Sequence, residues 1–134
     1  MITTEDRLNI YELISLHGHL VDEGRLDELD RVFIDEVTYD LSAFGMSIQQ
    51  GLEAIREAAL ALGDNNPVGH HITNIVIEDV KDDSTVHVRS KGIGIKTDGT
   101  AGSVVYVDVV KKQNSEWRIV SRQIFLRRRP LSVE

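Results

Sequence analysis

Four long β-type segments fill the second half of the chain, and they constrain its fold more than any other feature. The segments cover 70–80, 85–96, 103–112 and 117–127, and turn-forming residues separate them. Each is about 10 residues long, whereas strands in globular proteins have a mode of about 5–6 residues. Strands of this length twist strongly, so we expect a curved antiparallel sheet that wraps around helices.

The first third of the chain is predicted to be mainly helical. Thr3 and Asp6 resemble a capping box, Gly24 is a natural helix stop, and apolar residues recur between them at the 3.6-residue period. We expect helices over 4–21, 26–33 and 51–62, and one additional strand over 37–41. The sequence therefore predicts a single α+β domain over residues 1–134, a cone in which helices cover one end of the curved sheet and enclose a pocket.

The composition argues against several classes of function. The 134 residues contain no cysteine, which excludes thiol catalysis and cysteine-bound zinc or iron–sulfur clusters. The formal net charge of −7 argues against nucleic acid and membranes as partners, because both reward a basic surface. No apolar run approaches the roughly 20 residues that a membrane span requires, and the first residues lack the pattern of a signal peptide. We therefore expect a cytoplasmic protein.

Two adjacent histidines, His70 and His71, open the first long strand. Because side chains alternate between the faces of a strand, one of the two should point into the interior. Both faces are apolar enough that alternation alone does not say which. A histidine in a pocket can act as a general base, since free imidazole has a pKa of about 6.5. The alternative is a hydrogen-bonded core histidine without a catalytic role.

Two residues of the first helix also stand out. Asp22 lies in its last turn, where the helix dipole disfavours acids, so it is either a solvated helix end or a functional carboxylate. His17 lies in the apolar stripe, where an imidazole needs a partner. His17 and His19 make a poor metal pair on a helix, because about 200° of rotation separates them. No other spacing suggests a ligand set, so we expect no metal.

Other residues are candidates for the wall of the pocket. Arg122 lies in a mostly apolar strand, and a buried arginine needs an anionic partner, either a protein carboxylate or a substrate group. The aromatic candidates are Tyr11, Tyr39, Tyr106 and Trp117, although core packing is the commoner fate of such residues. The chain has no glycine-rich phosphate loop, nucleophile elbow or dinucleotide motif, and we expect no cofactor.

The order and spacing of several segments resemble the SnoaL-like branch of the nuclear-transport-factor-2-like superfamily. These segments are 10–14, 21–29, 32–40, 51–55, 70–74 and 117–122. The chain is most similar to the group that contains scytalone dehydratase, bile acid 7α-dehydratase and lindane dehydrochlorinase. The resemblance implies a cone-shaped, cystatin-like fold. It also implies proton removal from carbon, with loss of water or chloride, by a His–Asp dyad.

The resemblance also implies roles for individual residues. His70 and Asn74 match the family's His-x-x-x-Asn stretch, which the catalytic histidine opens, and Asp22 matches the aspartate that ends the first helix. The resemblance therefore favours His70 over His71 as the base. One position departs from the dehydratases, which carry a tyrosine five residues before the aspartate to polarise a substrate oxygen. His17 stands there instead, and it can also donate a hydrogen bond.

These observations lead to the hypothesis of a cofactor-independent lyase or isomerase, of the dehydratase or dehydrohalogenase type, acting on a small apolar ring compound. His70 is the general base, Asp22 holds its other ring nitrogen, and His17, a tyrosine or Arg122 stabilises negative charge. One alternative is a non-catalytic protein that binds a small hydrophobic ligand, and another is a dimeric interaction module built on the open face of the sheet. In each case we expect a homodimer or a higher oligomer.

Overall fold

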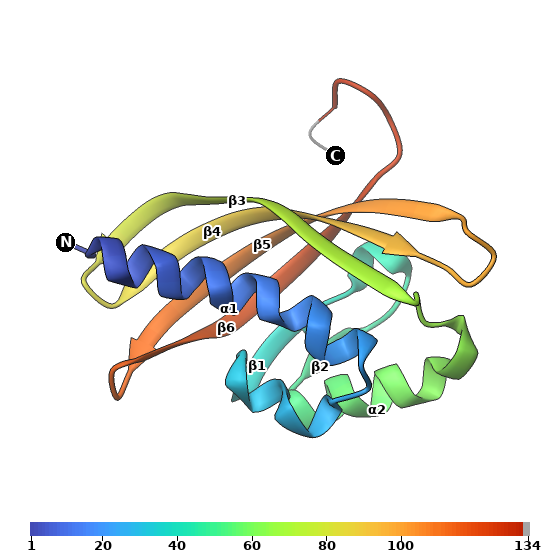
Figure 1. Cartoon of the computed structure of the whole chain (residues 1–134), viewed down its shortest axis with the longest axis horizontal. Helices are drawn as coiled ribbons and strands as arrows, with labels where there is room; N and C mark the ends of the chain where they lie inside the picture. The colour runs from blue at the N-terminus through green and yellow to red at the C-terminus, as the bar shows by residue number, and fades with distance from the viewer. Residues whose placement is uncertain (133–134) are drawn as a thin grey trace.

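The computed structural model describes residues 1–132 and shows one long helix lying across a curved, unclosed sheet (Figure 1). The helices are α1 (Thr4–Asp22) and α2 (Leu52–Leu62), with short 3-10 segments η1 (Leu26–Arg31), η2 (Ser42–Phe44) and η3 (Gly63–Asn65). The strands are β1 (Phe33–Asp40), β2 (Ile48–Gln50), β3 (Gly69–Asp82), β4 (Thr85–Ile95), β5 (Ala101–Gln113) and β6 (Glu116–Arg127). Their order in the sheet is β2-β1-β6-β5-β4-β3. The predicted α+β class is confirmed.

One strand pairing departs from the predicted antiparallel sheet. β1 runs parallel to β6, whereas the other neighbouring strands are antiparallel, so the sheet is mixed. The antiparallel prediction concerned the four long strands β3 to β6, which short turns join, whereas most of the chain lies between β1 and β6. β1 also begins earlier than predicted, because η1 ends at Arg31 and the chain is extended from Phe33. β2 has three residues, too few to give a strand pattern in the sequence.

A bulge in β3 changes which of its side chains face the core. The register with β4 shifts at three places, and at the first of them Asn74 has a positive φ of 53°. Ile72 packs against the core before this bulge and Ile75 packs against it afterwards. Strict alternation would place Val76 on the same face as Ile72, but Val76 is 54% exposed. The extra residue therefore resets the alternation, which no period-two pattern can anticipate.

The start of α1 is fixed to the sheet through Asp6. The Thr3 hydroxyl accepts a hydrogen bond from the Asp6 N–H, and the Asp6 carboxylate accepts one from the Thr3 N–H, which confirms the capping box. Trp117 Nε1 and Lys112 Nζ, on the hairpin of β5 and β6, donate to the same carboxylate at 3.0 and 3.1 Å. These donors, the Thr3 backbone first, hold the pKa of Asp6 well below its ordinary value.

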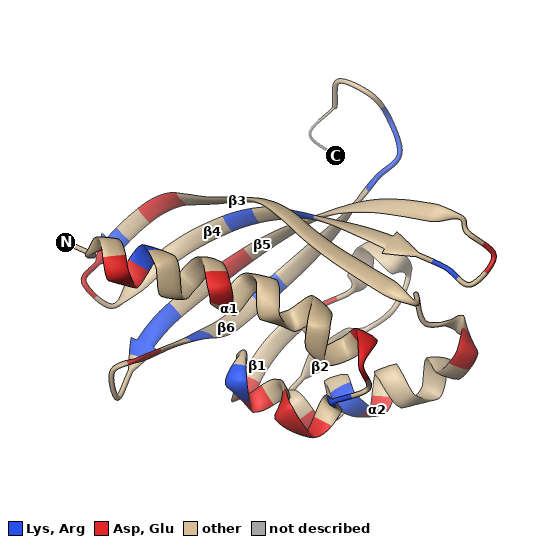
Figure 2. Ribbon diagram, viewed as in Figure 1, with Lys and Arg blue, Asp and Glu red and all other residues tan. Residues whose placement is uncertain are grey.

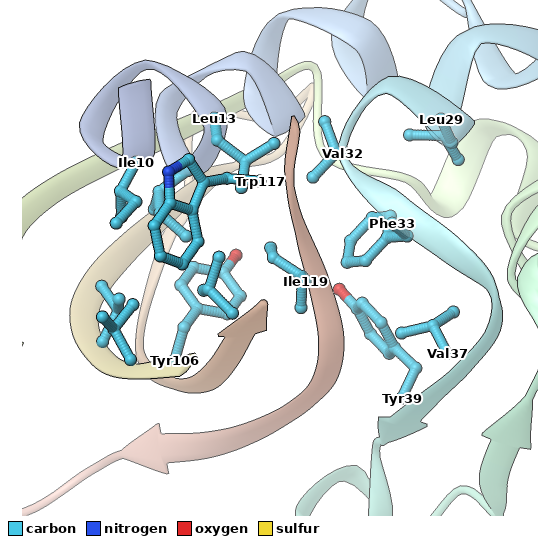
Figure 3. Close-up of a cluster of buried hydrophobic side chains, with 14 of the residues drawn as sticks. Ile10, Leu13, Leu29, Val32, Phe33, Val37, Tyr39, Tyr106, Trp117 and Ile119 are labelled. Atoms are coloured by element: carbon cyan, nitrogen blue, oxygen red, sulfur yellow. The ribbon is translucent and has the colours of Figure 1, made fainter. Parts of the chain in front are cut away.

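A hydrophobic core fills the space between α1 and the face of the sheet that α1 covers. Figure 3 shows Ile10 and Leu13 of α1 beside Trp117 and Ile119 of β6, with Phe33 of β1 on the other side of the cluster. Charged residues lie on α1, η1 and α2, and also within and at the ends of the long strands (Figure 2). Within residues 1–132, no helix has the length and apolar character that crossing a membrane requires.

Candidate functional site

The end of α1 lies against the start of β3, and this contact builds the site. Gly18 permits the close approach, because a Cβ atom there would lie 2.5 Å from the carbonyl oxygen of His70. α1 then ends at Asp22, and Gly24, with a φ of 69°, turns the chain away. Two residues 48 positions apart in the sequence, Asp22 and His70, are therefore neighbours in the structure.

Asp22 and His70 form a hydrogen-bonded pair. Oδ1 of Asp22 lies 2.6 Å from Nδ1 of His70, and the backbone N–H of His70 donates to both carboxylate oxygens at 3.0 Å. An ionised carboxylate only accepts hydrogen bonds, so Nδ1 carries a proton, and in the neutral ring Nε2 is the nitrogen that has the lone pair. The donors from His70 also offset the unfavourable position of an acid at the negative end of the α1 dipole.

His70 lines an apolar cavity of about 310 Å³, which lies between α1, α2 and the sheet. Most of its wall is hydrophobic, and it includes Val21, Leu41, Ile55, Val104, Ile124 and Leu126. The volume falls at the lower end of the range for small-molecule sites. Within this wall, His70 and His17 are the two imidazoles that can contact a bound molecule, which makes the cavity the candidate site.

Behind the cavity wall, His17 contacts a buried ion pair. Nε and Nη2 of Arg122 donate to Oδ1 and Oδ2 of Asp108 at 2.7 and 2.9 Å, and both side chains are fully buried. Nη1 of Arg122 lies 3.3 Å from Nδ1 of His17. Burial, followed by the charges of Arg122 and His70, holds the pKa of His17 well below its ordinary value. His17 is therefore a neutral imidazole at neutral pH.

Two of the predicted aromatic residues reach the cavity. Tyr39 and Tyr106 line it, and the guanidinium carbon of Arg122 lies 4.2 Å from the centre of the Tyr106 ring. Burial raises the pKa of both tyrosines, so each keeps its hydroxyl proton at neutral pH. They are therefore neutral polar groups in a wall that is otherwise mainly hydrophobic.

The structure does not bring the other four predicted pocket residues into the wall of this cavity. Arg122 is one of them, because it is fully buried behind His17. Asn74 is exposed at the bulge of β3, and Tyr11 is not among the residues that line the cavity. Trp117 is buried against Asp6 and lines a separate groove of about 610 Å³, which has a more polar wall and lies along α1 away from His70. The role that the family resemblance implies for Asn74 is therefore without support from its position.

Sequence reasoning missed two residues that shape the site, Asp108 and Gly18. Asp108 could have been found from its pattern, because it is a single acid among the valines of β5 and lies opposite Arg122 in β6. Gly18 gave no such signal, since a glycine inside a helix is explained only by what packs against it. Among residues 1–132, no three His, Asp or Glu side chains are grouped so that they could hold a metal ion.

Replacement of Gly18 by alanine is expected to separate Asp22 from His70. The added methyl group would meet a backbone carbonyl, so β3 has to move away from α1. A displacement of about 1 Å at a reacting group can cost about 100-fold in rate. The measurements are the imidazole Nδ1–H signal of His70 by NMR and the thermal unfolding midpoint.

The control for this variant is His19→Ala, at an exposed neighbouring position of α1. Alanine is a better helix former than glycine by about 1 kcal/mol, so a loss of stability in Gly18→Ala has to come from the clash. A Gly18→Ala protein with an unchanged His70 signal and an unchanged midpoint would contradict the role of this contact.

The geometry defines a class: a curved α+β domain with a histidine–carboxylate pair at an apolar cavity. The family is given by a sequence model of the SnoaL-like domain, which matches residues 3–123. The chain therefore belongs to the SnoaL-like family. No curated protein matches it in sequence.

Solved structures show the same fold. A proposed aromatic ring hydroxylase from Novosphingobium aromaticivorans is 26% identical, with 95% of this chain and 92% of that chain covered and a TM-score of 0.78. A cystatin-like protein of unknown function from Nostoc punctiforme is 22% identical, with 98% of both chains covered and a TM-score of 0.80. A proposed scytalone dehydratase from N. aromaticivorans is 21% identical, with 96% and 89% covered and a TM-score of 0.76.

Proposed function

We propose that the protein is a cofactor-independent lyase or isomerase that removes a proton from a carbon atom of a small apolar ring compound. The observation that carries this proposal is the 2.6 Å contact between Asp22 and Nδ1 of His70 at the wall of an apolar cavity. A histidine oriented in this way by a carboxylate presents its second nitrogen as a base.

In the proposed reaction, Nε2 of His70 takes the proton from carbon. The electron pair of the broken C–H bond forms a carbon–carbon double bond. In a lyase it expels a hydroxyl or halide from the adjacent carbon, and His70 returns its proton to a departing hydroxyl, which leaves as water. In an isomerase the negative charge moves onto a conjugated oxygen, and His70 returns the proton to another carbon. Asp22 stabilises the imidazolium in both cases.

The remaining groups of the cavity suit this chemistry. His17 can donate a hydrogen bond to a substrate oxygen, which stabilises negative charge as it develops there. The hydrophobic wall excludes water and strengthens these electrostatic interactions. The similarity to a proposed scytalone dehydratase and a proposed aromatic ring hydroxylase supports a ring compound as substrate.

We extend the proposal to a homodimer that acts in the cytoplasm. The face of the sheet that α1 does not cover carries Val76, Ile93 and Val107, which are 54, 39 and 37% exposed. A second copy of the chain would cover these side chains. Sedimentation equilibrium is expected to show a dimer in the wild-type protein and weaker association in Val107→Glu. A monomeric wild-type protein would contradict the proposed dimer.

The proposal is tested by proton exchange between carbon and solvent. Ring ketones and hydroxylated or halogenated ring compounds are incubated with the protein in deuterium oxide and followed by proton NMR and mass spectrometry. We expect at least one compound to gain deuterium or to lose water or halide. Compounds that bind in the cavity while none of them exchanges or eliminates would favour the non-catalytic ligand-binding alternative and overturn the proposed activity.

A further inference from the structure

Three side chains connect the core to the cavity: Asp108, Arg122 and His17. The Arg122 guanidinium uses Nε and Nη2 on the carboxylate of Asp108 and faces the ring of Tyr106. Its remaining terminal nitrogen, Nη1, lies 3.3 Å from Nδ1 of His17. Arg122 is fully buried and is not among the residues that line the cavity, so it is placed to act on His17 rather than on a bound molecule.

This contact determines where the His17 proton lies. A guanidinium has only donors and stays charged, so Nδ1 of His17 has to accept. The ring is then neutral, with its proton on Nε2. Within residues 1–132, Ser90 Oγ is the one buried side-chain nitrogen or oxygen atom that makes no hydrogen bond, so Nε2 of His17 is not such an atom. Among the described residues no hydrogen bond to Nε2 of His17 is found either. This nitrogen is therefore accessible from the cavity that His17 lines.

The charges around His17 hold the ring in this state. The groups around it are Arg122 with Asp108, His70 with Asp22, and the rings of Tyr106 and Phe33. Tyr39 lies in the wall of the same cavity. Asp108 offsets the charge of Arg122, whereas a proton on Nδ1 of His17 would point directly at the guanidinium. His70 gains a proton during the proposed reaction, and its ring centre lies 6.2 Å from that of His17. A second imidazolium beside it is therefore disfavoured.

We propose that Arg122, held by Asp108, is a positioning residue that keeps His17 in its neutral Nε2–H form. We further propose that this N–H makes the cavity selective for an uncharged acceptor oxygen, such as a ring ketone, over a carboxylate. The substrate class rests on the proposed function. It follows from the charges in the interior of the cavity, because neither His17 nor the neutralised Arg122 offers a free cation there. Lys96 also lines the cavity, but it is exposed to solvent, which screens its charge. Loss of a proton beside a ketone leaves an enolate oxygen, which this N–H would stabilise.

The first part of the test is nitrogen NMR of the imidazole rings between about pH 5 and pH 8. In the wild-type protein, His17 is expected to show the Nε2–H tautomer without titrating. The variant for comparison is Arg122→Met combined with Asp108→Leu, which removes the ion pair without leaving a buried charge. In that variant no guanidinium requires Nδ1 of His17 to accept a hydrogen bond, so the ring is expected to populate both the Nδ1–H and the Nε2–H tautomers. A proton on Nδ1, or titration of His17 in the wild-type protein, would overturn the inference.

The second part compares two probes of similar shape, α-tetralone and α-naphthoate. The ketone is expected to shift the Nε2–H signal of His17 and to bind at least about tenfold more tightly than the carboxylate, a preference that the double variant loses. Equal or tighter binding of the carboxylate would overturn the predicted substrate class. The tautomer is measured without turnover, so the expected NMR result together with no proton exchange would count against the proposed activity and not against the role of Arg122.

Discussion

Turnover is expected to fall by about 10²- to 10⁴-fold when His70 is replaced by glutamine, because a positioned base contributes about that much to a proton transfer. Glutamine is close to histidine in size but does not accept a proton at neutral pH. The His70 side chain is partly exposed, so the fold is expected to tolerate the change. The measurement is kcat/KM for a substrate found by the exchange screen, together with the thermal unfolding midpoint.

The matched control is His71→Gln, which changes the adjacent, exposed residue of β3 in the same way. It should retain near-normal turnover. Asp22→Asn should lower turnover as well, because the asparagine amide no longer holds Nδ1 as the protonated nitrogen. Near-normal turnover by His70→Gln, with the fold intact, would rule out His70 as the base. Equal losses in the His70 and His71 variants would point to a change in β3 rather than to chemistry.

Replacement of Asp108 by asparagine is expected to lower the free energy of unfolding by about 3–5 kcal/mol. The carboxylate is the counter-ion of a fully buried guanidinium and accepts two hydrogen bonds from it. Without that charge, Arg122 remains buried among Tyr106, Phe33 and His17 with no anion, and His17 cannot supply one. The measurement is urea unfolding at neutral pH.

The double variant Arg122→Met with Asp108→Leu shows how much stability is lost with the ion pair itself. The remainder of the loss in Asp108→Asn is then the cost of a buried guanidinium without a counter-ion. Replacing both partners of a buried ion pair with apolar side chains is often neutral or stabilising, so this protein should recover most of the lost stability. A loss below about 1 kcal/mol in Asp108→Asn would mean that water or another group reaches Arg122 after the change, and the buried position of the pair would have to be reconsidered.

Much of the fold could be predicted from the sequence, because its signals are local. The capping box at Thr3, the glycine after α1 and the turns between the long strands all appear as predicted. The parallel pairing of β1 with β6 could not be predicted, since no short connection joins those strands. The bulge at Asn74 was equally hidden, because asparagine tolerates a positive φ without requiring it.

The candidate site was accessible from the sequence only in part. Periodicity left His70 and His71 undecided, and the family resemblance favoured the one that lies beside Asp22 in the structure. The contact between Arg122 and His17 depends on a bulge in β6, at the register shift between Ile119 and Ser121. Arg122 therefore shares its buried face with Ile119, an odd number of residues away, which strict alternation does not allow.

The irregular register of β3 also protects the protein from self-association through its sheet edge. β3 is the last strand of the sheet and has 14 residues, so a regular ladder there would offer a long row of unpaired N–H and C=O groups to another chain. The three register shifts divide that row into short stretches that a foreign strand cannot follow. At the opposite edge, β2 has only three residues. Both ends of the sheet therefore resist fibril-like growth, by irregularity at one end and by shortness at the other.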